Sequence, residues 1–100
     1  MIAPSELYEA GFASSEHKDG DVIYVEFSKF LPSGIEIQVT HEIDKETDIV
    51  DLCYVEIGIE MSYRIVNTVQ TISDIKELER LLTGTERFVR EKEKKQLNIF

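Results

Sequence analysis

The chain has 100 residues, a length that suits one domain with a single modest core and is too short for two. Hydrophobic residues make up 42% of the chain, which excludes the composition typical of intrinsic disorder. The formal charge of −9 at pH 7 argues against direct binding to duplex nucleic acid, because phosphate contacts draw their affinity from clusters of Lys and Arg.

The sequence begins Met-Ile-Ala-Pro-Ser-Glu, without the basic and apolar regions of a secretory signal. No stretch approaches the roughly 18 apolar residues of a membrane span. The single cysteine, Cys53, cannot form an intramolecular disulfide and lies within an alternating apolar pattern. We therefore expect a cytoplasmic protein with a buried thiol and no membrane partner.

Residues 4–12 have the features of a short helix. Pro4 suits a first helical turn, Leu7 and Tyr8 supply an apolar side, and Gly11 is able to end the helix in a left-handed conformation. A helix this short needs packing against the rest of the chain to persist.

Residues 15–26, Ser-Glu-His-Lys-Asp-Gly-Asp-Val-Ile-Tyr-Val-Glu, imitate a calcium-binding loop, with glycine at the sixth place and glutamate at the twelfth. The first, third and fifth places, however, hold Ser15, His17 and Asp19, of which only the last is a carboxylate. The loop should also lead into a helix, whereas residues 22–30 alternate and are rich in β-branched and aromatic types. We therefore expect a β-hairpin that turns at the Asp-Gly pair, and no calcium site.

Four further patterns predict an antiparallel meander of four to five strands. Residues 12–17 and 22–30 are the expected arms of the hairpin, and residues 35–43 alternate without a break. After a polar connector, residues 53–65 also alternate, and Gly58 is expected to bend or break this long stretch. The inward positions of the two later stretches are Ile35, Ile37, Val39, His41, Ile43, Cys53, Val55, Ile57, Ile59, Met61, Tyr63 and Ile65.

A C-terminal helix is predicted to pack on one face of the sheet. Residues 71–74 match the capping-box pattern and precede apolar residues at helical spacing. Gly84 interrupts this pattern, so the helix either continues or divides there, and residues 90–100 form a loosely ordered tail. Strands followed by a helix predict the α+β class, with residues 1–100 as a single domain.

The sequence offers one weak catalytic constellation and no metal motif. His17, His41 and Cys53 match no compact metal-ligand spacing. His41 and Cys53 fall on adjacent expected strands, so a small enzyme that uses this pair is an alternative reading. An inward strand cysteine is more often an inert hydrophobe, and we therefore predict no catalysis, cofactor or metal.

The acidic residues offer the sharper hypothesis. The first 63 residues carry fourteen acids and three bases, whereas residues 64–100 carry eight bases and six acids. The alternation places carboxylates and tyrosines on one side of the strands, which is typical of a solvated face and, in the sharper reading, predicts a surface that recognises a basic protein partner. The predicted partner-binding residues are Tyr24, Glu26, Glu36, Glu42, Tyr54, Glu56 and Glu60.

The layout resembles that of short phage and prophage proteins of Gram-positive bacteria that lack an assigned role. The resemblance rests on Ser-Glu-Leu-Tyr-Glu-Ala-Gly-Phe at residues 5–12, the Asp19-Gly20 hairpin, the strand at 35–43 and the closing pattern at 72–82. It implies a mobile-element accessory protein that acts by binding, and it supplies no catalytic residue.

Together these observations predict a small non-enzymatic protein that works through protein contacts. A homodimer formed by sheet edges or by the C-terminal helix is compatible with this prediction. An acidic inhibitor that imitates nucleic acid and occupies the groove of a basic host protein is the alternative within the same class.

Overall fold

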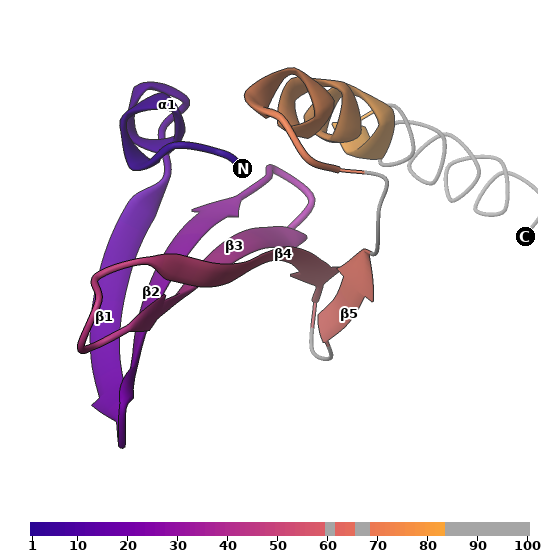
Figure 1. Ribbon diagram of the computed structural model, residues 1–100. Helices are drawn as coiled ribbons and strands as arrows, with labels where there is room; N and C mark the ends of the chain where they lie inside the picture. The colour runs from indigo at the N-terminus through magenta and orange to yellow at the C-terminus, as the bar shows by residue number, and fades with distance from the viewer. Residues whose placement is uncertain (60–61, 66–68, 84–100) are drawn as a thin grey trace, which may run out of the picture.

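The computed structural model describes residues 1–59, 62–65 and 69–83, and it contains a five-stranded antiparallel sheet with helices on one side (Figure 1). The strand order β1-β2-β3-β4-β5 follows the chain, so every neighbouring pair is joined by a hairpin connection. The predicted α+β class is confirmed. The elements are α1 (Pro4–Glu9), β1 (Ala13–Asp19), β2 (Val22–Phe30), β3 (Glu36–Asp44), β4 (Val50–Gly58), β5 (Ser62–Ile65) and a C-terminal helix over residues 72–83.

The start and end of α1 follow from its sequence. Pro4 occupies the first helical turn, and the side chain of Glu6 accepts a hydrogen bond from the backbone N–H of Ala3 at 3.3 Å. Gly11 adopts φ +92 directly after the C-cap residue, which is the left-handed conformation expected of glycine at this place. Leu7 is the fully buried residue of the helix and anchors it to the core.

The calcium-like segment folds as the predicted hairpin. Asp19 pairs with Val22, which leaves Gly20 and Asp21 as a two-residue turn with φ +61 at Gly20. A positive φ at the first of two turn residues is the type II′ arrangement, which matches the twist of the flanking strands. The chain therefore continues into β2 where a calcium-binding loop would continue into a helix.

The long alternating stretch after the connector is divided. β4 ends at Gly58 and β5 begins at Ser62, with Val55 opposite Ile65, so the chain reverses near Gly58 instead of continuing as one bent strand. β4 also begins three residues earlier than the alternation predicts. Its register against β3 shifts between Glu42, which pairs with Leu52, and Ile43, which pairs with Val50. Asp51 is thus the extra residue of a β-bulge.

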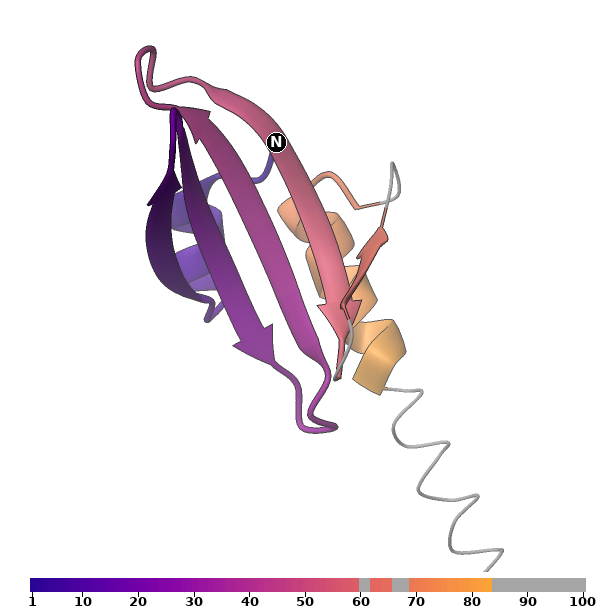
Figure 2. The same ribbon diagram turned by 90° about the horizontal axis from the view of Figure 1, so that it is seen from below.

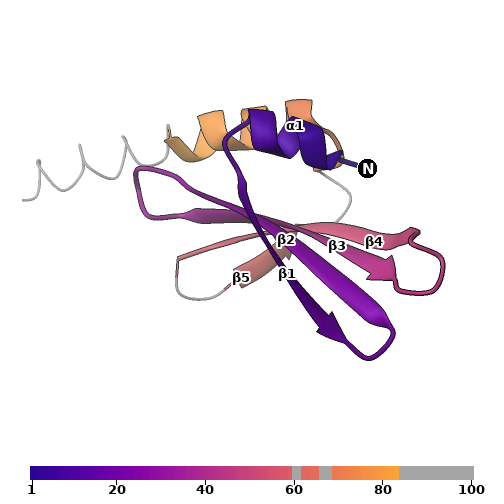
Figure 3. The same cartoon turned by 90° about the vertical axis from the view of Figure 1, so that its left-hand side faces the viewer.

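The core lies between the sheet and the helices. Its fully buried strand residues are Phe27 of β2 and three residues at predicted inward positions of β3 and β4, and Ile75 of the C-terminal helix belongs to the same cluster. Figure 3 shows α1 and the C-terminal helix on the same side of the sheet. We call this side the covered face. The cluster comprises Ile2, Leu7, Phe12, Phe27, Leu31, Ile37, Val39, Val55 and Ile75.

A lysine on the covered face connects both helices to the sheet. Lys29 of β2 donates a hydrogen bond from Nζ to the carbonyl oxygen of Ala10 at 2.8 Å, at the C-terminal end of α1. The same Nζ lies 3.0 Å from Oε1 of Glu79 in the C-terminal helix. A cation at the end of α1 also suits the negative end of the helix dipole.

The C-terminal helix begins with the predicted capping box. The backbone N–H of Asp74 donates to Oγ1 of Thr71 at 3.2 Å, and the backbone N–H of Thr71 donates to Oδ2 of Asp74 at 3.0 Å. The backbone N–H of Gln70, which donates to the Asp74 carboxylate at 2.9 Å, contributes most to holding the pKa of Asp74 below its ordinary value, and the side chain and backbone N–H of Thr71 add to the effect. The predictions for Gly84 and for the tail at 90–100 lie outside the described residues.

Two predicted inward residues at the end of the sheet are exposed instead. Tyr63 stands opposite Ile57 in the register but is 64% exposed, because β5 is a short edge strand. Ile59 follows the last residue of β4 and is also exposed. Neither described helix is long and apolar enough to cross a membrane.

Candidate interaction face and cavity

The strand register gathers the predicted partner-binding residues on one surface. Tyr24 of β2 pairs with Glu42 of β3, and Glu26 pairs with Thr40, which in turn pairs with Tyr54 of β4. Residues that stand opposite one another point to the same side of a sheet, so these side chains share the side away from the helices. We call this side the open face. Its predicted members in the described chain are Tyr24, Glu26, Glu36, Glu42, Tyr54 and Glu56, and Glu60 lies outside the described residues.

Side chains of neighbouring strands on the open face shield one another from solvent, although no described helix covers this face (Figure 3). Thr40, at its centre, is only 2% exposed and stands between Glu26 and Tyr54. The named tyrosines and glutamates are half-buried, not fully solvated as the alternation alone would suggest. This surface is therefore an ordered layer of polar side chains.

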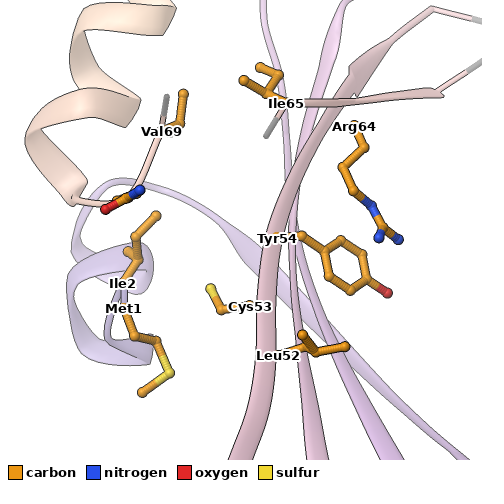
Figure 4. A pocket seen from close by; sticks show the side chains of 9 residues that line it. Met1, Ile2, Leu52, Cys53, Tyr54, Arg64, Ile65 and Val69 are labelled. Atoms are coloured by element: carbon orange, nitrogen blue, oxygen red, sulfur yellow. The ribbon is translucent and has the colours of Figure 1, made fainter. Parts of the chain in front are cut away.

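Tyr54 is the most strongly perturbed group of this layer. Burial, followed by a hydrogen bond with the side chain of Glu42, raises the pKa of Tyr54 to about 12. The guanidinium carbon of Arg64 lies 3.8 Å from the centre of the Tyr54 ring, a cation–π contact that is visible in Figure 4. The phenol is therefore neutral near pH 7, and its O–H donates a hydrogen bond to the carboxylate of Glu42.

A second aromatic stack lies at the β1 side of the open face. His17 and Tyr24 are opposite one another in the register, and their rings are 4.8 Å apart and nearly parallel at 11°. Nδ1 of His17 is 3.9 Å from Oε1 of Glu26. Neither His17 nor Arg64 was among the predicted members of this surface. Their positions in alternating strands were a usable signal, but the contacts depend on which strands are neighbours.

The structure brings the alternative catalytic pair together. His41 and Cys53 are direct partners in the β3–β4 register, on the covered face. His41 is buried, and this burial lowers its pKa, although a hydrogen bond with the backbone of Ile2 opposes the effect. Its ring also meets Phe27 edge to face, with centroids 5.3 Å apart. Nε2 of His41 has no hydrogen-bond partner within the described structure, so the pair lacks the bond that would activate a thiol.

A cavity of about 450 Å³ lies beside β4 (Figure 4). Cys53 and Ile2 approach it from the covered side, whereas Leu52, Tyr54 and Arg64 lie on the other side of the strand. The remaining lining residues are Met1, Ile65, Val69 and Gln70. The walls are mainly apolar, and Arg64 is the charged side chain among the lining residues, so they do not form a set of convergent acids and bases.

No group of three or more His, Cys, Asp or Glu side chains lies close enough to hold a metal ion in the part of the chain that the structure describes. The groups available for interaction therefore lie on the open face. They are carboxylates, two tyrosines, and the cation Arg64 at the β5 side.

Comparison with known proteins adds no relative: no protein-family model matches the chain, and neither a curated protein nor a solved structure does.

Proposed function

We propose that the protein is a binding module that recognises a basic surface of a protein partner through the open face. The observation that carries the proposal is the register, which aligns Glu26, Glu42 and Glu56 with two tyrosines on the uncovered side of three neighbouring strands. Carboxylates attract Lys and Arg side chains, and tyrosines supply the flat contact area that is common in interfaces. We expect it to act in the cytoplasm as an accessory protein of a phage or related element.

The mutual packing of side chains on the open face favours a binding surface over a face that is only solvated. Side chains that are already ordered lose little conformational entropy when a partner arrives. Tyr54, fixed between Glu42 and Arg64, is such a side chain. The flanking carboxylates then act on a basic partner at short range, and their attraction weakens as salt screens it.

The test is a pull-down from a lysate of the source organism at low and high salt, with two charge variants beside the wild type. Glu26→Gln with Glu56→Gln removes two charges from the open face. Glu9→Gln with Glu46→Gln removes two charges from exposed positions elsewhere and serves as the matched control. We expect one basic protein to be captured at low salt by the wild type and the control, and much less by the open-face variant.

Equal capture by the wild type and both variants would contradict the proposal, because binding would then follow net charge or another surface. Loss of binding to the purified partner with rising salt is a second requirement. If the captured partner is a nucleic-acid-binding protein and nucleic acid competes for it, the protein acts as a nucleic-acid mimic.

Catalysis by His41 and Cys53 is a separate hypothesis with its own test. A thiol reagent would have to label native Cys53 faster than it labels a cysteine introduced at the buried position of Val39. Equal or slower labelling of Cys53 removes the basis for an enzyme reading.

A further inference from the structure

The first strand of the sheet has an uncovered edge. β1 lies at one edge of the sheet (Figure 2). It pairs with β2 without a bulge from Ala13 to Asp19, and all seven of its residues are exposed. Its other edge pairs with no described strand. A regular exposed edge is a template for another strand unless its side chains prevent pairing.

The charges on this strand are self-complementary. Glu16 and Lys18 lie two residues apart, so both side chains point to the same side of the sheet. Neither forms an ion pair with another described residue. When two identical strands pair about a two-fold axis at residue k, residue k−1 of one strand stands opposite residue k+1 of the other.

We propose that a second copy of this chain pairs antiparallel with β1, with His17 at the two-fold axis. This register places Glu16 of each copy opposite Lys18 of the other and forms two cross-strand ion pairs. An axis at Glu16 or at Lys18 would place like charges opposite one another, which is unfavourable. The pairing uses the distal part of β1, away from the contact between Tyr8 and Ser14 at the α1 end.

The dimer has a ten-stranded continuous sheet. Because the two-fold axis is perpendicular to the sheet, the open faces of both copies point to the same side. Two acidic surfaces then form one, and His17 of each copy lies at the junction. Formation of this dimer does not depend on the basic partner proposed above.

Exchange of charges tests the register. Glu16→Lys alone and Lys18→Glu alone each place like charges opposite one another, and we expect each to weaken the dimer at least about tenfold in sedimentation or light-scattering measurements. An equimolar mixture of the two variants restores both ion pairs and should form a heterodimer. The double variant Glu16→Lys with Lys18→Glu should dimerise like the wild type.

Cross-linking supplies an independent readout. In a Cys53→Ser background, His17→Cys brings two cysteines opposite one another at a Cα separation of about 5 Å, which a disulfide spans. Ser15→Cys, on the same strand, separates the two cysteines by about 14 Å and is the control. We expect a disulfide-linked dimer from the first variant only.

A wild-type chain that stays monomeric at about 1 mM would overturn the proposal. So would a dimer that none of the charge variants affects, because its interface would lie elsewhere. Equal cross-linking of both cysteine variants would contradict the register.

Discussion

The two faces of the central strand β3 are both shielded from solvent, but by different means. On the covered face Ile37 and Val39 are fully buried in a hydrophobic cluster that includes Ile75 of the C-terminal helix. On the open face Thr40 is equally inaccessible, without any described helix above it. Neighbouring side chains on β2 and β4 produce this burial.

Low solvent exposure therefore has two different energetic consequences within one sheet. Burial of Ile37 removes apolar surface from water and stabilises the fold directly. Burial of Thr40 follows from a layer of polar side chains that interact with one another, for which the net gain in stability is small. The covered face should therefore govern stability, and the open face should be free to serve recognition.

The largest expected effect separates the two faces directly. Ile37→Ala should lower the free energy of unfolding by about 2 to 5 kcal/mol, because it leaves a cavity in the core. Glu36→Ala, the preceding residue on the open face, should change it by less than about 0.5 kcal/mol. Chemical denaturation measures both. Similar small effects at the two positions would contradict the claim that the covered face governs stability.

Lys29 tests how far polar contacts stabilise the covered face. Lys29→Met should cost about 1.5 kcal/mol, because Ala10 loses a charged hydrogen-bond donor and Glu79 loses its cation. Lys45→Met, in the exposed connector between β3 and β4, is the matched control and should be nearly neutral. An equal loss of stability in both variants would indicate that net charge, rather than the connection to the helices, is responsible.

The cap of the C-terminal helix should contribute somewhat less. Thr71→Ala removes the side-chain acceptor for the N–H of Asp74 and should cost about 1 kcal/mol of unfolding free energy. Thr71→Ser keeps the acceptor and should recover most of this loss. If both variants are equally destabilised, the hydroxyl is not what caps the helix.

Because His41 is buried on the covered face, the stability of the fold should depend on pH. Burial holds its pKa below the ordinary 6.5, so the unfolded chain binds a proton more readily than the folded chain. Stability should therefore decrease as pH falls from about 6.5 toward the lowered pKa of the folded state, and it should be independent of this group above that range.

Denaturation curves between neutral and mildly acidic pH measure the effect, and His41→Gln should flatten the decrease. A wild-type slope retained in His41→Gln would assign the pH dependence to another group.

The smallest effect on stability is expected at Tyr54. Glu42→Gln removes a negative neighbour and should lower the pKa of Tyr54 from about 12 toward its ordinary value of 10. Ultraviolet absorbance of tyrosinate follows the titration, with Tyr54→Phe to identify the signal. An unchanged pKa would mean that burial alone perturbs the phenol.

Local patterns in the sequence were sufficient to predict most of the helices and strands. The bounds of β2 agree with the alternation at residues 22–30, and the capping box at Thr71 and Asp74 is present. These features depend on neighbours within a few residues, such as turn chemistry and the period of the apolar positions. The early start of β4 was missed, because a bulge breaks the period of two at Asp51.

The sequence was sufficient to predict which residues belong to the candidate site, but not which of them contact one another. Alternation alone assigned Tyr24, Glu42 and Tyr54 to one side of the strands. The stacking of Arg64 on Tyr54 requires the reversal after Gly58, which brings β5 beside β4. The burial of Thr40 requires side chains from three strands at once, information that no single segment contains.

The bulge at Asp51 also bears on how this protein could change in length. Deletion of Asp51 would remove the one residue without a partner on β3 and leave the other β4 side chains on their present faces. A deletion between Cys53 and Ile57 would instead shift the strand by one residue and exchange core for surface positions. Loss of a codon should thus be tolerated at Asp51 and selected against a few positions later.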